Sequence, residues 1–174
     1  MTARGWVNVT PQELLQQFQK RRSVRIFTGE PLTGEELALI KEAGRWAASS
    51  SNRQARRFIL IHGREEVARF AQAAKMNPFA AKAGLLILGW STNVESRGAT
   101  ADVLISMTQM ETMAWTLGLG TCWLGTFARD EVPGMIGGAA PGWPVMMMAV
   151  GRYEGEGQCK AKMPADEMFF HGHF

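Results

Sequence analysis

The segment from Arg21 to Arg25 (RRSVR) carries the side chains best suited to ligand chemistry in this chain of 174 residues. It follows an expected helix and enters an extended stretch, where successive side chains alternate between two faces. Arg21, Ser23 and Arg25 then share one face. Guanidinium groups bind oxygens through paired hydrogen bonds, so this face predicts a phosphate or a polar ring edge as ligand. The simpler interpretation is a solvated basic surface, which is what most basic runs are.

Residues for acid–base catalysis are scarce. The chain has three histidines, and His62 lies at an expected strand end, while His171 and His173 lie in the tail without partners at metal-ligand spacing. Serine–histidine–acid catalysis stays open, but the sequence contains no G-x-S-x-G nucleophile elbow, no G-x-G-x-x-G after a strand and no Walker A loop. We therefore expect no metal site and no catalytic side chain, and we infer that a cofactor does the chemistry of any reaction.

Length and composition indicate one globular domain over residues 1–174, because 46% of the residues are hydrophobic and 20% are charged. The apolar stretches at 83–90 and 145–150 fall short of the roughly 18 residues that span a bilayer. We also see no secretory signal at the N-terminus. Cys122 and Cys159 provide no disulfide framework, which favours two reduced thiols in a cytoplasmic protein.

The net charge is only +3, with 19 basic residues against 16 acidic ones. A modest total with local basic clusters suggests anionic small molecules at least as much as a polyanion. Arg53, Arg56 and Arg57 form a second basic cluster, so a nucleic-acid binder is an alternative. The balancing acids disfavour it, since such a binder needs a wider basic stripe and clustered base-stacking aromatics.

Hydrophobic periodicity and capping signals predict an α+β domain. Thr10 and Thr33 each precede an acid by three residues, which is the capping-box pattern of a helix start. Helices are predicted at about 10–20, 33–47, 65–75 and 99–117, with one or two helical turns at 129–136. Strands are predicted at 57–62, 84–90 and 145–153, and a short strand or a turn at 121–124.

The helix predicted at 99–117 is apolar except for one narrow polar stripe: Asp102, Ser106, Gln109, Thr112 and Thr116. Such a helix is expected to be buried nearly all round, in a core or in an oligomer interface. The C-terminal tail is aromatic-rich and costly to leave in water. A second copy of the chain is a good candidate to cover it.

Six segments, in order along the chain, resemble the motifs of the nitroreductase family, whose members bind FMN. They are RRSVRIF at 21–27, WAASSSNRQARRF at 46–58, NPF at 77–79, GLGTCWLG at 118–125, PVMMMAVGRY at 144–153 and CKAKMP at 159–164. The resemblance implies a nitroreductase-like fold, with a central mixed or antiparallel sheet flanked by helices. It also implies an intertwined homodimer, in which the arm at about 154–174 packs on the partner subunit.

The same resemblance implies roles at a flavin site. Contacts to the phosphate, the ribityl chain and the pyrimidine edge of FMN would come from Arg21, Arg22, Ser23, Arg25, Lys160 and Lys162. Asn77 would hydrogen-bond the ring edge or the ribityl chain. The backbone of Leu124 and Gly125 would lie near the reactive nitrogen. Contacts to the flavin of the partner subunit would come from Ala48, Ser49, Ser50 and Asn52.

The implied activity is electron transfer from NAD(P)H through FMN to a small acceptor, such as a nitroaromatic or a quinone, in a ping-pong cycle. A non-catalytic flavin carrier or sensor of the same fold is the alternative. The chain departs from the family pattern at Ala48, where the family has proline, and at Gln54-Ala55-Arg56, where it has Q-P-W. Arg56 is expected to make the surroundings of the site more cationic, which leaves the substrate preference open.

Overall fold

The computed structural model describes residues 9–93, 97–137, 141–157 and 160–172. Its helices are α1 (Pro11–Lys20), α2 (Gly34–Arg45), α3 (Arg64–Ala73), α4 (Arg97–Thr116) and α5 (Val132–Met135). Its strands are β1 (Arg56–His62), β2 (Leu85–Ser91), β3 (Gly120–Leu124) and β4 (Trp143–Gly151), and three short turns of 3-10 helix are η1 (Ser50–Asn52), η2 (Pro78–Lys82) and η3 (Ala165–Glu167). The predicted α+β class and the predicted elements are confirmed, with ends that differ by a few residues.

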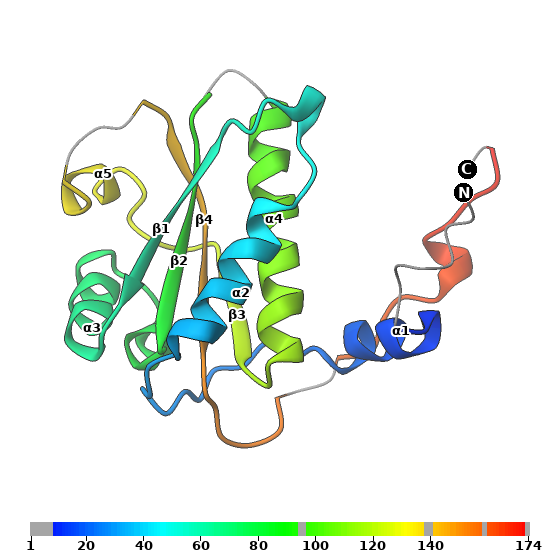
Figure 1. The fold of residues 1–174 in the computed structure, drawn as a ribbon, viewed down its shortest axis with the longest axis horizontal. Coiled ribbons are helices and arrows are strands. Elements are labelled where there is room, and N and C mark those ends of the chain that lie inside the picture. Colours follow the sequence, from blue (N-terminus) through cyan, green and yellow to red (C-terminus); the bar gives the residue numbers. More distant parts are fainter. Residues whose placement is uncertain (1–8, 94–96, 138–140, 158–159, 173–174) are drawn as a thin grey trace.

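The four strands form one antiparallel sheet in the order β1-β2-β4-β3. Strand β2 is central and buried along its whole length, because both of its faces are covered. Leu86 and Leu88 pack on the side of α3 and α5, whereas Leu85 and Ile87 pack on the side of α2 and α4. Figure 1 shows the resulting three layers, with the sheet between the two pairs of helices.

The capping boxes form as predicted at the start of α1 and α2. The Thr10 hydroxyl accepts a hydrogen bond from the Glu13 N–H at 3.2 Å, and the Glu13 carboxylate accepts one from the Thr10 N–H at 2.7 Å. The Thr33 hydroxyl likewise accepts from the Glu36 N–H at 3.2 Å, and the Glu36 carboxylate accepts from the Thr33 N–H at 2.8 Å. These local bonds satisfy helix N–H groups that have no partner within the helix, which is why the sequence alone locates the two helix starts.

An arm of α1 and the segment 160–172 extends from the three-layered body to one side (Figure 1). Helix α1 buries none of its residues, although Leu14, Leu15 and Phe18 lie along it. Phe169 and Phe170 are also exposed, at 68% and 51%. The expectation that a second copy covers this tail stays a prediction. Phe174, His173 and Cys159 lie outside the described residues.

Helix α4 is only partly buried in the single chain, so its burial nearly all round, in a core or in an oligomer interface, stays a prediction. Ile105 and Gln109 lie on a face that is exposed in the single chain, whereas Asp102 and Ser106 of the expected polar stripe are buried. The other faces of α4 pack against α2 and the sheet, and the Asp102 carboxylate accepts hydrogen bonds from Ser50 of η1. No helix in the described part of the chain is both long and apolar enough to cross a membrane.

Candidate functional site

The segment from Arg21 to Arg25, called the arginine segment below, lies against the start of β3. The Val24 N–H donates to the Thr121 carbonyl at 2.8 Å, and Ser23 forms a parallel bridge with Thr121. The Val24 side chain is buried in the core, so its neighbours point outward. Gly120 allows this close approach, since a Cβ there would lie 2.7 Å from a Val24 methyl. The sheet therefore fixes the backbone that carries the arginines.

A basic cavity of about 560 Å³ lies between this segment, the end of α1 and the C-terminal arm. It is lined by Phe18, Gln19, Arg21, Arg22, Ser23, Arg25, Lys160, Ala161 and Lys162. Five of these side chains are cationic, and none of the described residues that line the cavity is acidic. Two segments about 140 residues apart in the sequence thus converge on one volume suited to an anion.

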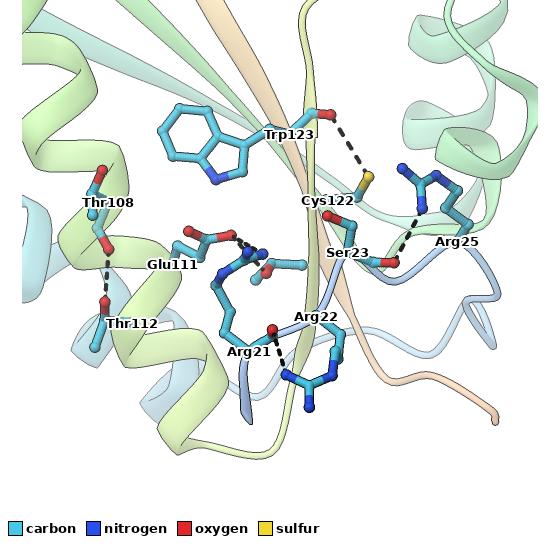
Figure 2. A network of polar contacts seen from close by, with 10 residues as sticks. Arg21, Arg22, Ser23, Arg25, Thr108, Glu111, Thr112, Cys122 and Trp123 are labelled. Carbon is cyan, nitrogen blue, oxygen red and sulfur yellow. Dashed lines mark hydrogen bonds and ion pairs between the residues drawn. The ribbon is translucent and has the colours of Figure 1, made fainter. Parts of the chain in front are cut away.

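Arg21 is held from beneath by α4 (Figure 2). Its Nη1 atom lies 3.4 Å from the Glu111 carboxylate, which also accepts a hydrogen bond from the Thr121 hydroxyl at 3.1 Å. Glu111 is buried, with 6% of its surface exposed. The sequence interpretation missed Glu111, although an acid in the middle of a mostly apolar helix was a signal that a basic group lies opposite.

The other two arginines bond to nearby backbone. Arg22 Nη1 donates to the Arg21 carbonyl at 3.0 Å and to that of Gln19, and Arg25 Nη1 lies 3.4 Å from the Ser23 carbonyl. Near Arg25, burial raises the pKa of the Cys122 thiol, and the neighbouring guanidinium offsets the rise only in part. Cys122 is therefore a neutral core group.

The segment from Ala48 to Asn52 lies at the opposite end of α4. Asp102 there accepts hydrogen bonds from the Ser50 N–H and hydroxyl, at 2.9 and 3.2 Å. Nine residues of α4 separate Asp102 from Glu111, which is about 13 Å of helix. Within one chain these predicted site residues do not line the basic cavity. Asp102, which anchors them, was also missed by the sequence interpretation.

Arg56 lies beneath the segment that follows α2. Its side chain is buried, and its terminal nitrogens donate to the Ala47 and Ala48 carbonyls at 2.5 and 2.8 Å. These carbonyls follow the end of α2, where a cation is favourable. Arg56 thus caps the chain that follows α2 and lies against the backbone of Ala48, one of the predicted site residues, so its effect on the charge around the site stays a prediction.

Asn77, Leu124 and Gly125 lie beyond the arginine segment, toward the far end of β3. Leu124 is three residues, or about 10 Å, along the strand from Thr121. Asn77 caps η2, accepting from the Phe79 N–H at 3.4 Å. The Ala128 N–H donates to the Ala74 carbonyl at 2.8 Å, so the turn that contains Asn77 lies beside the chain that follows β3.

Gly125 is set in place by Arg129. The Arg129 Nη2 atom donates to the Gly125 and Val145 carbonyls, at 3.1 and 3.2 Å, which ties the end of β3 to β4. Figure 2 shows the other end of β3, where Cys122 and Trp123 pass the arginine segment. The predicted residues therefore extend from the basic cavity along β3 in one chain, while 48–52 lie apart.

The model of the nitroreductase family matches residues 18–89 and 75–152, which include the arginine segment, β2, β3 and β4. An Archaeoglobus fulgidus protein named “Putative NADH dehydrogenase/NAD(P)H nitroreductase” is 25% identical over 131 residues, or 69% of this chain and 71% of that protein.

Two solved structures share the fold. NfrA2 of B. megaterium superimposes with a TM-score of 0.84 at 22% identity, over 92% of this chain and 74% of that one. An FMN-dependent nitroreductase of Clostridium difficile R20291 superimposes with a TM-score of 0.80 at 20% identity, over 92% of this chain and 99% of that one. At these identities the likeness establishes a common fold.

Proposed function

Because this chain belongs to the nitroreductase family of oxidoreductases, we propose that it binds FMN and transfers electrons from NAD(P)H to a small acceptor. The observation that carries the proposal is the convergence of Arg21, Arg22, Arg25, Lys160 and Lys162 on one cavity. Two of the family-like motifs thus meet in space, although they lie at opposite ends of the chain.

The residues of the basic cavity fit the phosphate end of FMN. A phosphate monoester carries nearly two negative charges and three acceptor oxygens, which guanidinium and ammonium donors satisfy. The cavity volume of about 560 Å³ lies within the usual range for small-ligand sites. Lys160 and Lys162 approach from the arm, so binding of the phosphate would also order the arm against the body.

The isoalloxazine ring of FMN would be contacted by the residues along β3. Asn77 offers a side-chain amide, and Leu124 and Gly125 offer backbone groups, from two turns that are hydrogen-bonded to each other through Ala74 and Ala128. Arg21 or Arg25 beside the pyrimidine edge would stabilise negative charge there. Bound FMN would supply hydride acceptance from NAD(P)H and electron delivery to a nitroaromatic or quinone-like acceptor, in a ping-pong cycle.

The protons taken up when the acceptor is reduced would come from water. Neither a histidine nor a carboxylic acid is among the described residues that line the cavity. Glu111 lies beneath it, but its carboxylate is engaged by Arg21 and Thr121. The role of the protein is then to bind, to orient and to set the local charge.

We further propose a homodimer in the cytoplasm. The apolar side chains of α1 and of the segment 160–172 are exposed to water in the single chain, and a partner subunit would bury them. Ala48, Ser49, Ser50 and Asn52, which lie apart from the cavity of their own chain, would then reach the flavin of the partner. Size-exclusion chromatography with light scattering tests the dimer, and a monomer at micromolar concentration would contradict it.

The decisive experiment is the visible spectrum of the purified protein, followed by identification of the released chromophore. We expect bound FMN that bleaches when NADPH or NADH is added without oxygen, and that regains its colour when a quinone is added. A bound flavin that stays oxidised would favour the carrier or sensor alternative. Colourless protein that neither binds added FMN nor is reduced with it would contradict the proposal itself.

A further inference from the structure

Glu111 is a buried carboxylate that contacts the basic cavity only through Arg21. Its side chain is 8% exposed, whereas that of Arg21 is 31% exposed and borders the cavity. The Thr121 hydroxyl donates to the same Glu111 oxygen that faces Arg21, at 3.1 Å. Figure 2 shows Glu111 of α4 beside the Arg21 guanidinium, between α4 and β3.

This contact leaves most of the Arg21 guanidinium available. Arg21 contacts Glu111 through its Nη1 atom, at 3.4 Å. Within the described part of the chain, neither Nε nor Nη2 of Arg21 has a hydrogen-bond partner. Those two nitrogens form the edge that binds planar oxygen pairs. A side chain held at one nitrogen and open at the other two is arranged to receive a ligand.

The ion pair with Glu111 also restricts the Arg21 side chain before a ligand binds. A free arginine has about 2 kcal/mol of side-chain entropy to lose on binding, and a side chain that is already held loses less. Thr121 is fully buried, and its backbone carbonyl accepts from the Val24 N–H. The same residue therefore anchors the carboxylate through its hydroxyl and the arginine segment through its carbonyl.

We propose that Glu111 is a positioning residue, which holds Arg21 so that its open edge binds an oxygen of FMN. The proposal rests on the proposed function. It assigns to α4 a part in ligand binding through Arg21, with no contact between Glu111 and the ligand. A residue that acts in this way matters only while Arg21 is present, and a double-mutant cycle measures that dependence.

The cycle compares wild type, Glu111→Gln, Arg21→Ala and the double variant by FMN titration of the apoprotein. Removing the negative charge of Glu111 would by itself strengthen the binding of an anionic ligand. That effect would be the same with or without Arg21. The comparison between backgrounds therefore isolates positioning. We expect Glu111→Gln to raise the Kd for FMN about tenfold more in the wild-type background than in Arg21→Ala, within the range measured for side chains in contact.

Glu111→Asp is the second variant, because it keeps the charge and shortens the reach by one methylene. Its effect on the Kd for FMN should depend on Arg21 in the same way. It replaces Glu111→Gln in the cycle if that variant fails to fold. Glu36→Gln is the matched control, since it cuts a similar carboxylate–guanidinium pair, to Arg152 at 3.0 Å, outside the cavity. It should leave the Kd unchanged in both backgrounds.

Equal effects of the Glu111 variants in both backgrounds, within about twofold, would overturn the positioning role. If wild type binds FMN in that case, the proposed function stands. If wild type binds no FMN, the proposed function fails separately. Titration of the same proteins with inorganic phosphate then decides the Glu111–Arg21 coupling, and equal phosphate affinities across the cycle would overturn it as well.

Discussion

Asp102 accepts two hydrogen bonds from Ser50, one from the backbone N–H at 2.9 Å and one from the hydroxyl at 3.2 Å. The carboxylate is 2% exposed and lies near the start of α4. The chain beyond Ser50 is strained, because Ser51, Asn52 and Gln54 have φ values of 51°, 54° and 53°. Residues other than glycine rarely take this left-handed conformation. Asp102 therefore anchors a strained segment to the body.

Asp102→Ala should loosen that segment. It leaves the Ser50 N–H without its acceptor, and we expect the free energy of unfolding in urea to fall by about 1–3 kcal/mol. Hydrogen exchange at the Ser50 amide should accelerate more than exchange in β2. Asp130→Ala, at an exposed position, is the control. Equal losses of stability in the two variants would argue against an anchoring role.

Gly120→Ala should disturb the arginine segment through packing. The new Cβ would lie 2.7 Å from a Val24 methyl and 2.8 Å from the Tyr153 ring, closer than carbon atoms pack. Overpacking of this kind costs about 1–3 kcal/mol of stability. FMN affinity should fall with it, since Val24 fixes the backbone between the arginines. Gly134→Ala has open space around its Cβ and should change neither quantity.

Lys162→Ala should weaken FMN binding without destabilising the body. The lysine lies on the exposed arm and borders the cavity, so its loss removes a charge near the proposed phosphate site. We expect the Kd to rise by roughly tenfold, because hydrogen bonds to charged groups contribute about 1.5–3 kcal/mol. The thermal midpoint of the apoprotein should be unchanged.

The salt dependence of FMN binding should also be shallower in Lys162→Ala, because one charge no longer contributes. Lys75→Ala provides the comparison, as its ammonium pairs with Glu131 on another part of the surface. If both variants bind FMN as wild type does, Lys162 has no part in the phosphate site.

Glu36→Gln should alter how stability depends on pH. Burial on its own would raise the pKa of Glu36, but the Thr33 N–H bond and the Arg152 guanidinium outweigh it, so the pKa is lowered. A carboxylate with a lowered folded-state pKa contributes stability above its unfolded pKa, and this contribution is lost as pH falls through the folded value.

The unfolding free energy of wild type should therefore fall more steeply than that of Glu36→Gln between about pH 5 and pH 3. Glutamine keeps the capping box, which separates the effect of charge from that of the cap. Urea unfolding across this range measures both proteins, with Glu35→Gln, an exposed neighbour, as control. Parallel curves would show that the Arg152 pair contributes no pH-dependent stability.

Features that depend on local interactions were predictable from the sequence. Thr10 and Thr33 marked two helix starts, since a capping box needs only residues three apart. The apolar run at 84–90 marked the central strand. The ordered motifs predicted the nitroreductase family, which the family match confirms. They also paired the arginine segment with Lys160 and Lys162, and these residues do border one cavity.

The sequence by itself thus determined the elements, the family and the chemical types gathered for an anionic ligand. Only the tertiary structure decided which charges are available and which are engaged. Arg56 closes the end of α2, Glu111 holds Arg21, and Asp102 holds Ser50 across 52 residues of chain. The physical reason is that a buried charge is tolerated only where packing places a hydrogen-bonding or oppositely charged partner beside it. The spacing of residues along the chain does not reveal which partner that is.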